Sequence, residues 1–220
     1  MKRDDLVKFF DYTILKPDAT DEILRKFASE AVEMNVKGAC VHLIALPIVS
    51  PIIKKSNVKL VTVAGFPFGS MPMNVKESEI AYALKFEIDE LDIVLNLNYF
   101  KSGKKKEAEA EIRRIKNLLP GDIILKVIIE TGLLSVEEIA EAARLVSDGG
   151  ADFVKTCTGF IGRGVTVEDV KIIRSSVGKS MDIKASAGIK TLKQVLELIE
   201  AGATRIGLSA AKEVLSELSE

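Results

Sequence analysis

Short apolar segments alternate along the chain with longer segments in which apolar residues recur every three or four positions. The short segments are rich in Val, Ile and Leu, and this alternation is typical of βα units that build a parallel sheet. Eight segments are predicted to be strands: 12–15, 38–41, 60–64, 91–95, 123–129, 153–156, 183–185 and 205–207. Eight strands favour a closed (β/α)8 TIM barrel over an open doubly wound sheet, which usually holds fewer strands at this length.

Seven further segments carry helical patterning: 21–34, 75–86, 105–118, 136–146, 167–175, 192–201 and 212–218. Two of them are preceded by N-cap residues with an acid three positions later, Ser135 with Glu138 and Thr166 with Asp169. No linker rich in Pro, Gly or Ser and no low-complexity tract divides the 220 residues. The sequence therefore predicts one barrel domain over residues 1–220.

Composition narrows the classes of partner. Thirty-one Lys and Arg residues balance 32 Asp and Glu residues for a net charge of -1, so no overall field attracts nucleic acid or an anionic membrane. The acidic start of the chain lacks the apolar core of a signal peptide, and no apolar stretch approaches the length that spans a bilayer. Cys40 and Cys157 lie far apart and are expected to be free thiols in a reducing compartment. We expect a soluble cytoplasmic protein.

Several familiar sites find little support. The ligands that zinc prefers are limited to His42, Cys40 and Cys157, whose spacing matches no zinc pattern, although composition alone leaves carboxylate-held magnesium open. Glycines 159, 162 and 164 follow the wrong order for a dinucleotide fingerprint. The segment GLSAA at 207–211 comes within one residue of a nucleophile elbow, but only His42 could serve as its base. We expect His42 to be structural rather than part of the barrel mouth.

Three lysines stand inside predicted strands, at 126, 155 and 184, each 29 residues from the last. Parallel barrel strands are covered on both faces and tend to be continuously apolar, so a lysine there is anomalous on burial grounds. One such lysine could be explained by a side chain that reaches solvent from a strand end. Three are harder to explain in that way.

Lys155 and Lys184 are expected to lie on neighbouring strands and to point toward the C-terminal mouth of the barrel. Each cation would disfavour protonation of the other, and low dielectric would act in the same direction. A neutral amine is what nucleophilic attack on a carbonyl requires. Asp92 in the fourth strand could relay protons, or it could form a structural ion pair with Lys126.

At these residues the chain resembles the deoxyribose-phosphate aldolase family, and the similarity runs in order along nearly its whole length. The matching segments are DYTILKP at 11–17, VAGFPFG at 63–69, ELD at 90–92, LKVIIET at 125–131, DFVKTCTGF at 152–160 and IKAS at 183–186. Several motifs in order are much stronger evidence than any single one.

The resemblance implies a class I aldolase that needs no metal or organic cofactor. Its reaction would be the reversible cleavage of 2-deoxy-D-ribose 5-phosphate to D-glyceraldehyde 3-phosphate and acetaldehyde. Lys155 would form a Schiff base with the substrate, Lys184 would favour the neutral form of Lys155, Asp92 would take part in proton transfer, and Lys126 would support this network.

Phosphate-binding residues are predicted in the loops after strands six, seven and eight: Gly159, Ala187, Gly188, Gly207 and Ser209. The chain departs from the family pattern mainly here, with Ala187 where relatives usually have glycine and Ala210 where many have serine. Cys157 replaces a common serine, and the tail 217–220 lacks the tyrosine found in some relatives.

Two alternatives stay open. One is another class I aldolase or transaldolase-like enzyme that accepts a different sugar phosphate or an unphosphorylated aldehyde. The other is a non-catalytic barrel, for which the set Asp92, Lys155 and Lys184 would be an awkward feature. Barrels of this type commonly self-associate through their outer helices, so we also expect a homo-oligomer.

Overall fold

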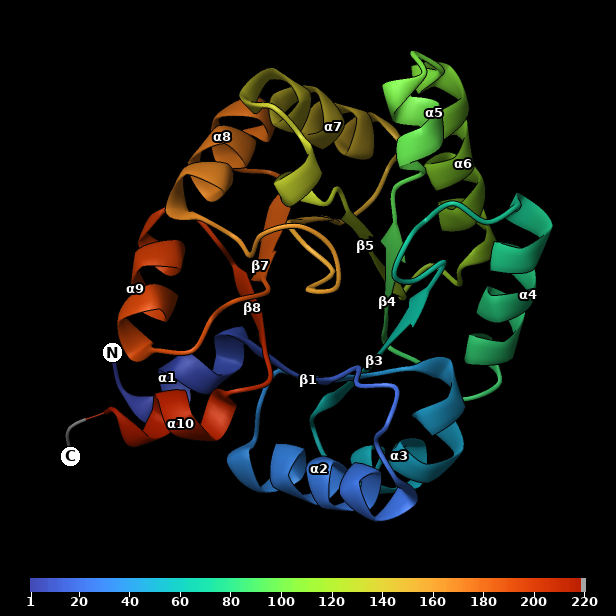
Figure 1. Cartoon of the computed structure of the whole chain (residues 1–220). Coiled ribbons are helices and arrows are strands. Elements are labelled where there is room, and N and C mark those ends of the chain that lie inside the picture. Colours follow the sequence, from blue (N-terminus) through green and yellow to red (C-terminus); the bar gives the residue numbers. More distant parts are fainter. Residues whose placement is uncertain (219–220) are drawn as a thin grey trace.

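The computed structural model describes residues 1–218, and its eight parallel strands close into a barrel in the order of the sequence, from β1 round to β8. Figure 1 shows the strands as a central ring with the helices outside it. The strands are β1 (Phe10–Ile14), β2 (Gly38–Val41), β3 (Lys59–Ala64), β4 (Glu90–Val94), β5 (Ile124–Ile128), β6 (Phe153–Lys155), β7 (Asp182–Ser186) and β8 (Arg205–Leu208). The predicted barrel and all eight predicted strands are confirmed, with ends displaced by at most two residues.

All seven predicted helices are present. The α-helices are α1 (Arg3–Leu6), α2 (Asp21–Met34), α3 (Leu46–Ile53), α4 (Met73–Leu84), α5 (Leu97–Lys101), α6 (Lys105–Leu118), α7 (Val136–Asp148), α8 (Val167–Val177), α9 (Leu192–Glu200) and α10 (Ala211–Ser216). The 3₁₀ turns are η1 (Val7–Phe9), η2 (Leu43–Ala45) and η3 (Thr131–Leu133). The end of the tail, residues 219–220, lies outside the described residues.

Helix α3, which completes the second βα unit, was missed in the sequence. Its eight residues include Pro47 in the first turn and Pro51 in the interior, and proline normally argues against a helix interior. The buried positions are nevertheless Leu46, Val49, Ser50 and Ile53, which is the spacing of one helix face.

Local signals fix the helices beside the site. The capping boxes predicted at Ser135–Glu138 and Thr166–Asp169 are both formed, so α7 and α8 begin where the sequence indicates. The main apolar core lies between the strands and the surrounding helices. Cys40 and Cys157 are free, as predicted, and both side chains are buried. Within residues 1–218, no helix has both the length and the apolar character needed to cross a bilayer.

Candidate active site

Strand register decides which of the unusual strand residues meet. Lys155 and Lys184 are paired neighbours on β6 and β7, and Asp92 pairs with Lys126 across β4 and β5. Lys126 itself is level with Phe153, two residues below Lys155. The equal spacing of 29 residues therefore does not place three lysines at one height: two lie side by side near the mouth and the third lies deeper in the barrel.

Asp92 joins all three lysines. Its Oδ1 accepts from Lys126 Nζ at 2.8 Å, and its Oδ2 accepts from both Lys155 Nζ and Lys184 Nζ at 2.8 Å. The Asp92 carboxylate is fully buried, and the lysine side chains are at most 4% exposed. The four residues singled out from the sequence thus form one contiguous ion-pair cluster. The ion pair suggested between Asp92 and Lys126 is present, and it belongs to that larger cluster.

Three further members of this cluster were missed by the sequence reasoning. Asp11 lies 2.5 Å from Lys184, Glu90 lies 2.5 Å from Lys126, and Arg205 contacts the carboxylates of Asp11 and Glu90 at 2.6 and 2.9 Å. A signal was available for Glu90, because residues two apart on a strand share a face and Asp92 had already been identified.

The Lys184 cation is stabilised rather than weakened. Burial acts to lower the pKa of Lys184, but the carboxylates of Asp11 and Asp92 outweigh it and raise that pKa above its ordinary value. The expected lowering of the pKa by low dielectric and a neighbouring ammonium does not occur at Lys184, because burial in this barrel comes with the buried carboxylates of Asp11 and Asp92.

Charge balance distinguishes Lys155 from the other two lysines. The ion-paired cluster contains three acids and, without Lys155, three cations, so its formal charges already cancel. The ammonium groups of Lys126 and Lys184 each lie within 4 Å of at least two carboxylates, whereas Lys155 has Asp92 alone. The positive charge of Lys155 is therefore the surplus charge of the cluster.

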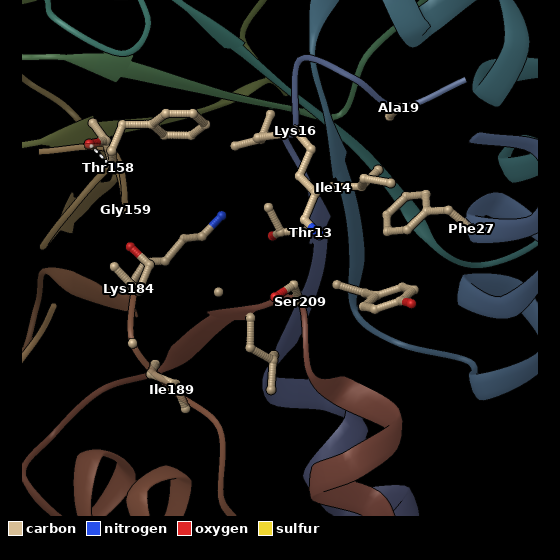
Figure 2. Close-up of a pocket in the computed structure, with 18 of the residues that line it drawn as sticks. Thr13, Ile14, Lys16, Ala19, Phe27, Thr158, Gly159, Lys184, Ile189 and Ser209 are labelled. Carbon is tan, nitrogen blue, oxygen red and sulfur yellow. Dashed lines mark hydrogen bonds between the residues drawn. The ribbon is translucent and has the colours of Figure 1, made fainter. Parts of the chain in front are cut away.

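A cavity of about 770 Å³ opens above the cluster at the C-terminal end of the strands. Lys155 and Lys184 line its floor, while Asp92 and Lys126 lie beneath it. All five predicted phosphate-binding residues line its wall: Gly159, Ala187, Gly188, Gly207 and Ser209. Figure 2 shows Lys184 and Lys16 both directed into this space. Lys16 belongs to the DYTILKP segment, but the sequence reasoning gave it no role.

Gly207 makes room for one of the lysines. A Cβ atom at this position would lie 3.0 Å from Lys184 Cε and 3.0 Å from Ser186 Cβ, which is closer than the packing of a barrel interior readily accepts. Glycine therefore lets the Lys184 side chain pass β8 on its way to Asp92. This contact gives Gly207 a structural reason besides its place in the cavity wall.

Ala187 adopts a backbone conformation that alanine rarely takes, with φ at 78°. The left-handed region costs a residue with a Cβ roughly 1–2 kcal/mol. Replacement by glycine relieves this strain, but part of the gain in stability is lost because glycine loses more entropy on folding. We expect Ala187→Gly to raise the free energy of unfolding by about 0.5–1 kcal/mol in urea titrations. Ala201→Gly is the control, since Ala201 has φ at -68°, and it should lower stability. A loss of stability in Ala187→Gly would contradict the strain argument.

His42 has a structural position. Its Nε2 lies 2.8 Å from the Leu15 carbonyl oxygen, and its ring meets the edge of Phe66 with centroids 5.6 Å apart. His42 itself is not among the residues that line the main cavity, although its partner Leu15 is. Within residues 1–218, no group of three or more His, Cys, Asp or Glu side chains is arranged to hold a metal ion.

A family model described as DeoC/LacD family aldolase matches residues 13–217. The chain belongs to this aldolase family. Among DeoC/LacD relatives, one from Corynebacterium diphtheriae, named deoxyribose-phosphate aldolase, is 42% identical over 219 residues, covering 99% of each chain. A solved structure named QR15, an aldolase, superimposes with a TM-score of 0.93 at 38% identity, covering 97% of this chain and 95% of that one.

A second solved structure is described as the unique tetrameric structure of deoxyribose phosphate aldolase from Aeropyrum pernix. It has a TM-score of 0.91 at 31% identity and covers 98% of this chain and 91% of that one. The comparisons confirm the resemblance, the barrel fold and the class of enzyme expected from the sequence, an aldehyde-lyase. The DeoC/LacD family works through a lysine Schiff base, and this chain presents its two cavity-lining strand lysines side by side.

Proposed function

We propose that this aldolase cleaves and forms 2-deoxy-D-ribose 5-phosphate, with Lys155 as the residue that becomes covalently bound to substrate. The observation that carries the proposal is the contrast between two adjacent amines on the cavity floor. Lys184 is held as a cation by two buried carboxylates, whereas Lys155 has one carboxylate contact and reaches the cavity. A nucleophile beside a fixed cation is the arrangement that imine catalysis requires.

The reaction follows from this arrangement. Neutral Lys155 Nζ attacks the C1 aldehyde of the open-chain sugar, and the resulting carbinolamine takes up one proton and loses water to leave a protonated imine. A base removes the proton of the C3 hydroxyl and the C2–C3 bond breaks. Its electron pair forms the C1=C2 double bond of an enamine, while the π pair of the C=N bond moves to nitrogen. Glyceraldehyde 3-phosphate departs, C2 takes up a proton, and water hydrolyses the remaining imine to acetaldehyde and free Lys155.

Asp92 suits proton transfer only when Lys155 is neutral. Burial acts to raise the pKa of Asp92, but the ammonium groups of Lys126, Lys155 and Lys184 outweigh it and hold that pKa well below its ordinary value. The carboxylate is therefore a weak base while all three lysines are charged. It gains basicity when Lys155 gives up its proton, because one fewer cation faces it.

The phosphate end of the substrate is assigned to the wall formed by the loops after β6, β7 and β8. Backbone N–H groups at Gly159, Ala187 and Gly188, with the Ser209 hydroxyl, can donate to phosphate oxygens, and alanine at 187 keeps the backbone donor. Lys16 adds an exposed cation that is directed into the same cavity. These donors favour a phosphorylated sugar over the free sugar.

We expect kcat/KM for 2-deoxyribose 5-phosphate to exceed that for 2-deoxyribose by about 100-fold or more, since several hydrogen bonds and one cation together contribute roughly 3 kcal/mol. Lys16→Met should reduce this ratio by about tenfold. Lys26→Met is the matched control, because Lys26 also lines the cavity but projects from α2, where Glu30 lies close enough to affect it electrostatically. Equal values for the two sugars in the unmodified protein would refute phosphate recognition and favour an aldolase for unphosphorylated aldehydes.

We also propose that the protein is cytoplasmic and self-associates. The free, buried thiols of Cys40 and Cys157 suit a reducing compartment. The Aeropyrum pernix relative is described as a tetramer, which supports a homo-oligomer here.

A further inference from the structure

The loop between β6 and α8 directly follows Lys155, and Figure 1 shows it curling inward over the ring of strands. The start of this loop is held by Glu130, a residue beyond the end of β5 that the proposed reaction does not use. The Glu130 carboxylate accepts from the Thr158 backbone N–H at 3.1 and 3.3 Å and also from the Thr158 hydroxyl. Thr158 Oγ1 in turn accepts from the Phe160 N–H at 3.2 Å. One carboxylate thus organises residues 158–160.

Glu130 occupies an unfavourable position for its residue type. It is fully buried, although glutamate rarely is, and burial raises the pKa of its carboxyl group. Its backbone is also left-handed, with φ at 54° and ψ at 65°, a region that residues with a Cβ seldom adopt. Strain and burial at one residue beside a cavity point to a functional constraint, since a glycine or asparagine would fit the backbone at lower cost.

The held segment forms part of the wall assigned to phosphate. Thr158 and Gly159 both line the cavity, and a Cβ at Gly159 would lie 3.5 Å from the Ala187 side chain. Farther along the loop, the Val165 N–H donates to the Ala187 carbonyl at 3.1 Å. The loop after β6 therefore packs on the loop after β7, and the placement of residues 158–160 sets one side of the cavity.

A separate set of contacts holds the far end of the loop. Arg163 binds Asp169 through two nitrogens at 2.6 and 2.8 Å, and Asp169 also accepts from the Thr131 hydroxyl at 3.0 Å. Loss of the Glu130 contacts would consequently release residues 158–160 without detaching the whole loop. Lys155 itself is held independently of Glu130, by strand β6 and by Asp92.

We propose that Glu130 is a positioning residue that, through Thr158, preforms the cavity wall that receives the phosphate end of the substrate. This rests on the proposed function for the identity of the substrate. Its role requires a hydrogen-bond acceptor at Glu130 rather than a negative charge, because both donors come from neutral groups of Thr158. Imine formation at Lys155 with a small aldehyde that carries no phosphate does not depend on it.

The test compares Glu130→Met, which keeps the length of the side chain but accepts no hydrogen bond, with Glu130→Gln, which keeps one acceptor oxygen. Glu130→Met is expected to raise KM for 2-deoxyribose 5-phosphate by about tenfold or more. The rate at which borohydride traps acetaldehyde on Lys155 should stay within about twofold, and Glu130→Gln should restore most of the loss in KM. Equal losses in trapping and in KM, or no rescue by glutamine, would overturn the proposal.

Amide hydrogen exchange gives a readout that needs no substrate. In Glu130→Met, the amides of residues 158–160 should exchange faster, while those of β6 and α8 keep the rates of the parent protein. Unchanged exchange at 158–160 would overturn the positioning role even if the enzyme uses another sugar. A different outcome separates the two proposals. If exchange at 158–160 is faster in Glu130→Met but the parent protein acts equally on the phosphorylated and the free sugar, the proposed substrate is rejected and the positioning role of Glu130 is retained.

The matched control is Asp89→Leu. The Asp89 carboxylate accepts from the Leu60 N–H at 2.8 Å and so fastens the start of β3, at the end of the barrel opposite the cavity. This variant should leave KM for 2-deoxyribose 5-phosphate unchanged, and a rise equal to that of Glu130→Met would count against the proposal.

If Glu130→Met does not fold, Thr158→Val carries the same test, because it removes the hydroxyl and leaves Glu130 in place. Its KM should rise, and an unchanged KM together with unchanged exchange would overturn the inference.

Discussion

Lys155→Met is expected to lower kcat by on the order of 10⁴-fold or more and to abolish the covalent adduct that borohydride traps with acetaldehyde. Methionine fills nearly the same volume, so the loss would report the missing amine rather than a cavity. The substitution also removes the one positive charge of the cluster that no acid balances. The three remaining cations then match the three acids: Lys126, Lys184 and Arg205 against Asp11, Glu90 and Asp92. The variant should therefore fold normally.

Lys184→Met is the matched comparison for this experiment. Removing Lys184 leaves two carboxylate contacts without their cation and removes a positive charge beside Lys155, so imine formation should need a higher pH to reach its maximal rate. Peptide mapping should still place the trapped adduct on Lys155. An adduct on Lys184 or Lys126 in the parent protein, or undiminished trapping in Lys155→Met, would reject the assignment of the nucleophile.

The site residues that could be predicted from the sequence are those whose charge is unusual for their position in the fold. Lysines at 126, 155 and 184 stand in strands that are otherwise apolar, and no packing argument accounts for them. Asp11, Glu90 and Arg205 gave a weaker signal, because Glu90 and Arg205 are the first residues of β4 and β8 and Asp11 is the second residue of β1. A charge at a strand end usually meets solvent. Only barrel closure shows that these three side chains point inward and meet.

Height within the barrel could not be predicted from spacing. The two intervals of 29 residues are equal in sequence, yet the β5–β6 register places Lys126 two residues below Lys155, while the β6–β7 register places Lys155 and Lys184 level. The stagger of barrel strands arises from closure of the whole sheet and has no local signature. Likewise, the left-handed backbone of Glu130 and Ala187 depends on loop contacts between distant strands, which a residue-by-residue pattern does not contain.

Asp92→Asn should be the most damaging change to the cluster that leaves every lysine in place. Without this carboxylate, two acids face three cations even when Lys155 is neutral, so the positively charged imine forms in an environment that already has surplus positive charge. We expect kcat to fall by about 10²–10⁴-fold, with a much smaller change in KM, because the carboxylate acts on the imine and on proton transfer rather than on the phosphate. A rise in KM with constant kcat would instead make Asp92 a substrate-positioning residue.

The same substitution has a separate signature in stability. Removing one partner of a buried ion-pair cluster costs about 3–5 kcal/mol. Asp5→Asn is the control, because Asp5 pairs with Lys8 at an exposed site, where the cost is about 0–1 kcal/mol. The pKa of Asp92 is lowered in the folded protein, so its contribution is fully present above the unfolded value of 3.8 and is lost as pH falls below it toward the folded pKa. Asp92→Asn should therefore be less stable than the parent at pH 7, and the difference should shrink as the pH falls below 3.8. Urea titrations at pH 7 and at successively lower pH values measure this difference directly, and a gap that stays constant down to the most acidic condition would show that the Asp92 charge is not what stabilises the cluster.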